Sequence, residues 1–293
     1  MQSAQQRLSL DLDAYFRDPE YVDPKLPPHF MQFSIDSGGT NVPVKMWLAG
    51  GAGAKGTVII SPPMGGSDSM NSVAIPLMNA GIHVLSYRPR GIRDPKVAYS
   101  QMKQMEDIHA MINWVVANAG ANKTAPFGPP LRLDPERIAL FGMSGGGGNL
   151  SYAVCAESKH ANFAIAVATG NIEWALRPDN LEKLRPMFNR IKETTRGRHD
   201  YEAWMLAMTP EEVKSTSLIN IAPKLVSEHL LLLGGHNDMT APIAMHHNLI
   251  AKALQDAGVK DFTSRVLETD HGFTTKRYAL PRVMIAWLHQ RGF

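Results

Sequence analysis

The sequence predicts an α/β protein in which a mainly parallel sheet is covered by helices on both faces. Short runs of β-branched and aliphatic residues alternate with longer segments of helical periodicity along most of the 293 residues. Strands that alternate with helices form parallel sheets, because each crossover between parallel strands needs a long connection. The composition, 44% hydrophobic and 19% charged, supplies enough apolar side chains for a large core and excludes a disordered or collagen-like chain.

The first two expected strands form a hairpin at one edge of the sheet. The segments 30–35 and 42–48 are separated by Ser37-Gly38-Gly39, and a glycine pair between two such runs is typical of a tight turn. The hairpin therefore adds an antiparallel edge. The remaining strands are expected at 57–61, 82–87, 137–141, 163–168, 230–233 and 262–267.

The helices expected between these strands follow the helical period. In the clearest one, 101–118, the apolar residues of one face are Met105, Ile108, Met111, Ile112 and Val115. Others are expected after the glycine-rich turn at 145–148 and at 71–79, 241–257 and 277–290.

The domain organisation follows from where the strand signals stop. Residues 1–29 are polar and proline-rich and are interpreted as an N-terminal arm that packs on the core or on another subunit, which leaves a homo-oligomer open. Residues 30–170 and 218–293 form the core domain. Residues 171–217 hold no strand signal and are interpreted as a small helical cap insertion over the end of the sheet, with an ordinary helical connection as the alternative.

The net charge and the lengths of the apolar runs argue against a nucleic-acid-binding protein and against a membrane-spanning one. Thirty basic and 27 acidic residues give a net charge of +3, which is too small for a nucleic-acid-binding footprint. Residues 1–16 lack the apolar stretch of a signal peptide, and no apolar run approaches the ~18 residues of a membrane span. We therefore expect a cytoplasmic protein with neither a nucleic acid nor a membrane as partner.

Cysteine and histidine content give no sign of a metal. The single cysteine, Cys155, excludes an internal disulfide and a cysteine zinc site, and is interpreted as a small buried hydrophobe. His236, His246 and His247 lack a metal-binding spacing and are interpreted as structural, although His236 is also a candidate for lining the site.

The motif that carries chemistry is Gly142-Met143-Ser144-Gly145-Gly146. It fits G-x-S-x-G and lies between a buried strand and a helix, which is the context this motif requires. A nucleophile on so tight a turn has strained backbone angles, and glycines at 142 and 146 remove the Cβ atoms that would clash. The turn is expected to lift the Ser144 hydroxyl above the sheet.

A serine hydroxyl needs a base and a group that orients this base. Candidates follow the last two expected strands: Asp238 in Gly-His-Asn-Asp, and His271 in Asp-His-Gly-Phe. Both lie just past the carboxyl end of a strand, the edge where ligands bind in open α/β sheets. Glu173, after the preceding strand, is the alternative acid, whereas Asp270 is interpreted as a loop cap.

These three segments resemble the α/β-hydrolase superfamily, and within it the branch of dienelactone hydrolases and prolyl-oligopeptidase-like catalytic domains. The resemblance covers roughly Phe30 to the C-terminus. It implies Ser144 as nucleophile, Asp238 as orienting acid and His271 as general base, with no cofactor or metal. The peptidases of this branch carry a large extra domain for which this chain has no room, so a peptidase is less expected.

An oxyanion hole is expected beside the nucleophile. One donor is the backbone N–H of Gly145. The other comes from the loop after 57–61, where many relatives have His-Gly-x-Gly-Gly but this chain has Pro-Pro-Met-Gly-Gly. Because proline has no N–H, Met64 is the expected donor and Gly65 the fallback. Candidate substrate-binding residues are Gly65, Met143, Trp174, Trp204 and His236; the methionines and tryptophans of the cap indicate an apolar pocket.

Three other patterns have simpler interpretations. The G-x-G-x-x-G at 51–56 joins two strands, whereas a dinucleotide fingerprint must open a helix, so it is interpreted as a hairpin loop. The glycine run 145–148 lacks the Lys-Ser/Thr of a phosphate-binding loop. Arg88, Arg90 and Arg93 follow a strand; one of them clamps a substrate carboxylate, or they stabilise the loop by pairing with an acid such as Asp94.

The function expected from these observations is hydrolysis of small carboxylic esters through an acyl-enzyme. The alternative is another reaction at the same residues: lactone, amide or thioester cleavage, acyl transfer or a biosynthetic elimination. A non-catalytic binding protein of the same fold is the third hypothesis, and it need not keep all three residues.

Overall fold

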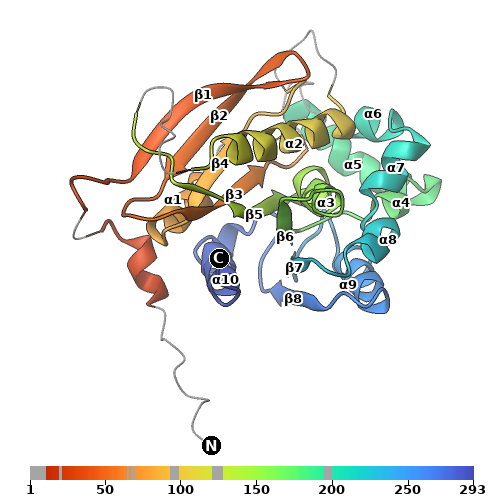
Figure 1. The fold of residues 1–293 in the computed structure, drawn as a ribbon. Coiled ribbons are helices and arrows are strands. Elements are labelled where there is room, and N and C mark those ends of the chain that lie inside the picture. Colours follow the sequence, from red (N-terminus) through yellow and green to blue (C-terminus); the bar gives the residue numbers. More distant parts are fainter. Residues whose placement is uncertain are drawn as a thin grey trace, which may run out of the picture.

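The computed structural model describes residues 11–19, 22–64, 66, 70–92, 99–120, 128–194 and 200–293. Within these ranges the chain forms an eight-stranded sheet in the order β1-β2-β4-β3-β5-β6-β7-β8 (Figure 1). The pairs β1/β2 and β2/β4 are antiparallel, and every other neighbouring pair is parallel. The predicted α/β fold with an antiparallel N-terminal hairpin is therefore confirmed. The strands are β1 (His29–Ser37), β2 (Thr40–Leu48), β3 (Lys55–Ser61), β4 (His83–Tyr87), β5 (Leu133–Met143), β6 (Ala161–Val167), β7 (His229–Gly235) and β8 (Asp261–Leu267).

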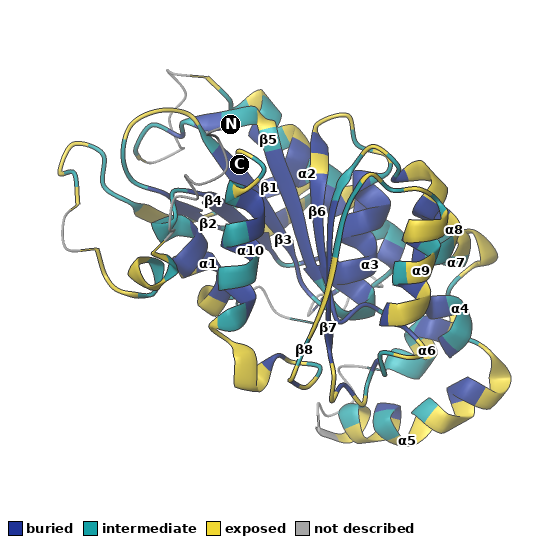
Figure 2. Cartoon of the chain, turned by 90° about the horizontal axis from the view of Figure 1, so that it is seen from below, coloured by how far each residue is buried: buried dark blue, intermediate teal, exposed yellow. Residues whose placement is uncertain are grey.

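Both faces of the sheet are covered, as Figures 1 and 2 show. Successive residues of a strand point to opposite faces, so Leu230 and Leu232 join one core whereas Leu231 and Leu233 join the other. The first core packs under α2 (Gln101–Ala117), α3 (Ser144–Cys155), α8 (Leu218–Ile221) and α9 (His247–Asp256). The second packs under α1 (Asn71–Asn79) and α10 (Ala279–His289). Runs of four buried leucines are typical of strands covered on both sides.

The hairpin turn consists of two residues. Gly38 and Gly39 have φ of +57° and +77°, which is the left-handed region that glycine enters without a steric penalty. The register that results pairs Ser37 with Thr40.

The helix expected at 241–257 begins later than predicted. The structure starts α9 at His247, and residues 243–246 form a turn. The backbone of His246 leaves the helical region, with φ of −123° and ψ of −79°, and its ring accepts the backbone N–H of Asn171 at 2.8 Å. This contact with a distant segment lies at the point where the helical pattern indicated by the apolar spacing is interrupted.

The residues that the structure describes between 171 and 217 contain four helices: α4 (Ile172–Ala175), α5 (Pro178–Thr194), α6 (Tyr201–Leu206) and α7 (Pro210–Thr216). No strand occurs in the described part of this segment. Buried side chains of α4, α5 and α6 form a small third cluster made of Ala175, Leu181, Phe188 and Met205. A helical insertion is thus observed, whereas its status as a separate cap stays a prediction.

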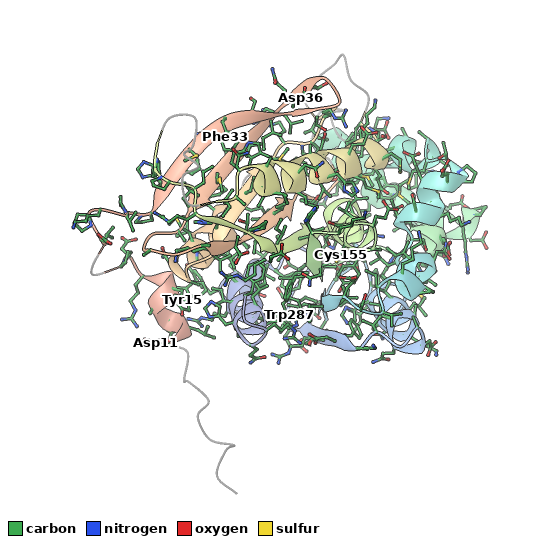
Figure 3. The ribbon with its side chains drawn as sticks, in the orientation of Figure 1. Asp11, Tyr15, Phe33, Asp36, Cys155 and Trp287 are labelled. Atoms are coloured by element: carbon green, nitrogen blue, oxygen red, sulfur yellow. The ribbon has the colours of Figure 1, made fainter. Side chains whose placement is uncertain are left out.

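The described part of the N-terminal arm lies on its own chain. A short 3-10 helix, η1 (Leu12–Phe16), contacts α1 and α10. Asn79 donates from Nδ2 to the carbonyl oxygen of Tyr15 at 3.2 Å, and the ring of Phe16 lies edge-on to Tyr278. The contact area includes Tyr15, which Figure 3 labels near the base of the fold. A homo-oligomer stays a prediction.

Cys155, also labelled in Figure 3, is buried at the end of α3, as predicted. Its burial raises the pKa of the thiol well above its usual value. Among the helices of the described ranges, none is long and apolar enough to cross a bilayer.

Candidate active site

The turn between β5 and α3 positions Ser144 at the carboxyl end of the sheet. The backbone of Ser144 has φ of +61°. Residues other than glycine rarely adopt this conformation, so the predicted backbone strain is confirmed. The turn is tight: a Cβ on Gly142 would lie 1.9 Å from the carbonyl oxygen of Gly147. Only glycine at 142 permits so close an approach of the two backbone segments.

The same glycine run lets the turn pack on the loop after β3. A Cβ on Gly146 would lie 2.2 Å from the backbone nitrogen of Met64, and one on Gly147 would lie 2.3 Å from the carbonyl oxygen of Ser61. Both distances are far below van der Waals contact. The glycines therefore bring the Met64 backbone against the turn that carries Ser144.

Three side chains from separate strand ends meet at this turn. His271 Nε2 lies 3.0 Å from Ser144 Oγ, and His271 Nδ1 lies 2.7 Å from Asp238 Oδ2. The Asp238 carboxyl group is buried, and its other oxygen accepts the two N–H groups of Thr240 and Ala241. With both oxygens engaged, the carboxylate has a fixed orientation toward the imidazole. Ser144, His271 and Asp238 therefore have the geometry of nucleophile, base and orienting acid.

The two other carboxylates considered from the sequence, Glu173 and Asp270, form hydrogen bonds with residues other than His271. Glu173 accepts a hydrogen bond from the side chain of Asn220. Asp270 accepts the backbone N–H of Thr274 at 2.7 Å and the hydroxyl of Thr269 at 3.3 Å, which agrees with its interpretation as a loop cap. Asp238 is thus the carboxylate that contacts His271 in the described residues.

The loop after β3 is held by side chains from two other elements. Gln104 of α2 donates from Nε2 to the carbonyl oxygen of Pro62 at 3.1 Å and to Ser61 Oγ at 3.0 Å. The hydroxyl of Tyr201, on α6, donates to the carbonyl oxygen of Met64 at 2.9 Å. Met64 and Gly145 both line one cavity with Ser144, whereas Gly65 lies outside the described residues.

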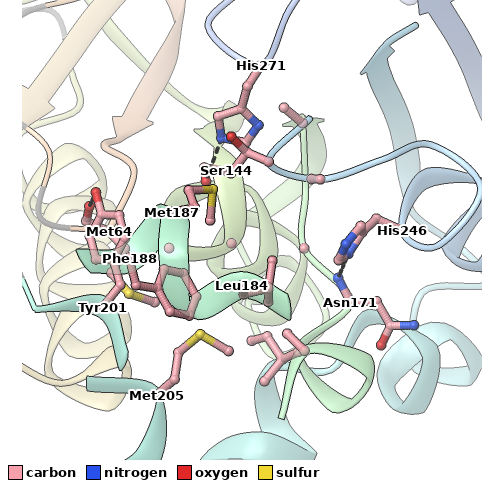
Figure 4. A pocket seen from close by; sticks show the side chains of 18 of the residues that line it. Met64, Ser144, Asn171, Leu184, Met187, Phe188, Tyr201, Met205, His246 and His271 are labelled. Atoms are coloured by element: carbon pink, nitrogen blue, oxygen red, sulfur yellow. Dashed lines mark hydrogen bonds between the residues drawn. The ribbon is translucent and has the colours of Figure 1, made fainter. Parts of the chain in front are cut away.

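This cavity lies between the Ser144 turn and the helical insertion (Figure 4). Its walls are mainly apolar. The lining side chains of the insertion are Ile172, Ala175, Leu184, Met187, Phe188, Tyr201, Met205 and Met208. The apolar character that the sequence indicated for the pocket is therefore present.

Four predicted substrate-binding residues do not line this cavity. The ring of Trp174 lies edge-on to that of the lining residue His246, with ring centroids 4.9 Å apart. Trp204 packs on the rings of Tyr99 and Tyr201. Met143 packs into the core under α1 and α10, and His236 is exposed.

Sequence reasoning missed four polar residues of the lining: Gln101, Asn171, Thr240 and His246. Gln101 begins a helix and Asn171 follows a strand, and neither is part of a motif. His246 was interpreted as structural. Only the packing of α2, α4 and α9 around Ser144 brings these residues to the cavity.

Arg90 stabilises its loop. It forms ion pairs with Asp107 and Glu106. Arg93 and Asp94 lie outside the described residues. In the ranges that the structure covers, no three His, Cys, Asp or Glu side chains are grouped so that they would hold a metal ion.

The fold and the Ser144 turn define an α/β-hydrolase-type protein. The chain belongs to the alpha/beta hydrolase fold family, whose model matches residues 98–275, more than half of the chain. No curated protein matches it by sequence.

Among solved structures, the chain resembles an esterase from Pyrococcus furiosus, with a TM-score of 0.66, 14% identity, and coverage of 90% of this chain and 91% of that one. It also resembles an esterase from Pyrobaculum calidifontis, with a TM-score of 0.65, 17% identity, and coverage of 90% of this chain and 86% of that one. For an acylaminoacyl peptidase from Pyrococcus horikoshii the TM-score is 0.65 and the identity 14%, with coverage of 90% of this chain but 41% of that one. The chain thus spans about two fifths of that peptidase. These likenesses show the fold.

Proposed function

We propose that the protein is a serine hydrolase that cleaves carboxylic esters through an acyl-enzyme on Ser144. One observation supports the proposal above all others: the His271 ring lies between Asp238 and Ser144. Its Nδ1 is 2.7 Å from Asp238 Oδ2, and its Nε2 is 3.0 Å from Ser144 Oγ. This arrangement gives a serine hydroxyl the base that it needs and gives the base its orientation.

The roles follow from the hydrogen bonds. Asp238 accepts from His271 Nδ1–H, so the neutral imidazole turns the lone pair of Nε2 toward Ser144. His271 takes the hydroxyl proton as Ser144 Oγ attacks the ester carbonyl carbon. The backbone N–H groups of Gly145 and Met64 are the proposed donors to the oxyanion that forms.

His271 then gives the proton to the departing alcohol, and the acyl group stays on Ser144. In the second half of the reaction His271 removes a proton from water, the resulting hydroxide attacks the acyl carbonyl, and Ser144 Oγ leaves with the proton. The products are a carboxylic acid and the free enzyme.

One fact supports a simple ester as substrate. The lining of the cavity is largely apolar, which suits the hydrocarbon part of such an ester.

The test is hydrolysis of p-nitrophenyl esters from acetate to laurate, with Ser144→Ala run in parallel. Ser227→Ala is the matched control, because Ser227 is an exposed serine whose hydroxyl donates a hydrogen bond to the side chain of its neighbour Glu228. We expect turnover by the wild type and by Ser227→Ala, and loss of turnover and of fluorophosphonate labelling in Ser144→Ala.

Labelling of Ser144 without ester turnover would redirect the search to lactones, amides, thioesters, acyl transfer and eliminations. Turnover that survives in Ser144→Ala would refute the assignment of the nucleophile. A folded protein with neither labelling nor turnover would favour the non-catalytic alternative.

A further inference from the structure

The apolar cavity contains a histidine that the proposed reaction does not use. His246 lies just before α9, is 3% exposed, and lines the cavity together with Ser144 and His271. Its Nδ1 accepts the backbone N–H of Asn171 at 2.8 Å, the bond drawn in Figure 4. The ring is therefore held in place by one of its two nitrogens.

The same bond fixes where the ring proton lies. Burial lowers the pKa of His246 to about 4, so the imidazole is neutral at pH 7. Because Nδ1 accepts a hydrogen bond, the proton of the neutral ring must be on Nε2. No residue in the described ranges accepts a hydrogen bond from that Nε2–H. Buried donors in native proteins nearly always have a partner, so this unpaired donor in a wall residue of the cavity indicates a group that a ligand would satisfy.

Gln101 carries a second polar atom without a partner, and this one is an acceptor rather than a donor. It is 2% exposed and lines the same cavity. The amide end near the carbonyl oxygen of Gly145, at 3.4 Å, must be Nε2, because two oxygens would repel. Its Oε1 is then an acceptor without a partner among the described residues. Two residues of the cavity wall thus each carry one buried polar atom, a donor and an acceptor, without a partner among the described residues.

We propose that His246 determines specificity: its Nε2–H donates to an oxygen carried by the acyl group of the substrate, so the cavity favours acyl groups with a keto, ether or amide oxygen over plain alkyl chains. Gln101 Oε1 is the complementary site for a hydroxyl or amide N–H on the same acyl group. This inference rests on the proposed ester hydrolysis, which it makes more specific.

The physical basis is the cost of an unmade bond. A plain alkyl group in the cavity leaves the Nε2–H without a partner, whereas an acyl oxygen that reaches it satisfies it. Sites built to hydrogen-bond a substrate atom discriminate against the analogue that lacks it.

The experiment compares p-nitrophenyl octanoate with analogues that carry a ketone at successive carbons of the chain. Two variants separate the two nitrogens of the ring. In His246→Asn the side-chain oxygen can take the place of Nδ1 and accept the N–H of Asn171, but no donor reaches the position of Nε2. In His246→Gln the amide N–H reaches that position, but the acceptor for Asn171 is lost. Melting temperatures verify that both variants fold.

The quantity measured is the kcat/KM of each oxo ester divided by that of octanoate. At one ketone position we expect this ratio to fall roughly tenfold in His246→Asn and much less in His246→Gln, as the loss of one hydrogen bond predicts. Three results would overturn the inference: a ratio unchanged in His246→Asn, a fall in His246→Gln alone, or an equal fall in both variants at every ketone position. The second would mean that His246 only accepts the N–H of Asn171.

A binding measurement keeps this inference separate from the proposed function. Calorimetry with octanoic acid and the oxo acids needs no turnover. Tighter binding of one oxo acid by the wild type, lost in His246→Asn, in a protein that hydrolyses no ester would uphold the binding site and refute the esterase. Equal affinity for all the acids would overturn the site, whatever the esters show.

Discussion

The hydroxyl of Tyr201 donates a hydrogen bond to the carbonyl oxygen of Met64, 137 positions away in sequence, over 2.9 Å. Tyr201 lies on α6 of the helical insertion, and Met64 lies in the loop after β3. The insertion therefore contacts the loop that supplies the proposed second oxyanion donor, and the two are expected to act together.

Tyr201→Phe is expected to lower kcat about fivefold, the effect of losing a bond of ~1 kcal/mol that orients the Met64 backbone. The measurement is ester turnover, with Tyr152→Phe as control, because the buried Tyr152 hydroxyl has no partner among the described residues. A drop of equal size in both variants would show that Tyr201 acts only through general stability.

Asp238→Asn is expected to lower kcat by about 10³ to 10⁴, because an amide cannot hold the His271 tautomer that accepts the serine proton. Glu173→Gln, the change at the competing carboxylate, is expected to leave kcat within about twofold, since Glu173 contacts Asn220. Steady-state kinetics of both variants decide between the two acids, and a larger effect at Glu173 would reverse the assignment.

Gly146→Ala is expected to destabilise the fold by roughly 2–4 kcal/mol, because its Cβ would lie 2.2 Å from the Met64 nitrogen. At Gly145 the nearest atom to an added Cβ is 4.0 Å away, so Gly145→Ala is expected to fold with nearly wild-type stability. Denaturant unfolding compares the two. Equal midpoints would contradict the contact between the turn and the loop.

Met205→Ala is expected to move the optimal acyl chain toward longer esters, because Met205 is buried in the wall of the cavity. Leu206, its neighbour, is 61% exposed, and Leu206→Ala is expected to leave the profile unchanged. The p-nitrophenyl ester series gives both profiles. The alanine variants of Trp174 and Trp204 belong in the same series, since neither ring lines the cavity.

Acid is expected to destabilise the protein between pH 6.5 and pH 4. Burial lowers the pKa of His83, His246 and His247 to about 4, whereas an unfolded histidine titrates near 6.5. The unfolded state therefore binds more protons in this range. Each ring contributes stability that is present above pH 6.5 and is lost as the pH falls toward 4, about 3 kcal/mol when complete.

His247→Gln tests this pH dependence. Its amide can keep the bond that His247 Nε2 makes with Ser264 Oγ at 2.9 Å, but it does not titrate. Urea unfolding at pH 7.5 and pH 4.5 is expected to show a loss of stability on acidification that is smaller than in the wild type by roughly 2 kcal/mol. An identical loss in both proteins would show that His247 does not contribute.

The fold was predictable because its signals are local. Buried parallel strands are continuous apolar runs, such as Leu230 to Leu233, and the hairpin needs only the Gly38-Gly39 pair between two such runs. The predicted start of α9 was wrong for a non-local reason. The backbone of His246 leaves the helical region, and its ring accepts the N–H of Asn171, 75 positions away. No spacing of apolar residues encodes such a contact.

The sequence by itself determined the candidate nucleophile and its base, because the strand-turn-helix geometry requires glycines at fixed offsets from Ser144, and because residues after parallel strands reach the same edge. Only the tertiary structure decided which carboxylate contacts His271, and which residues form the cavity wall. Gln101, His246 and Tyr201 line the same cavity as Ser144 and come from three parts of the chain far apart in sequence. Their positions depend on helix packing, which is the sum of many weak contacts and has no local pattern.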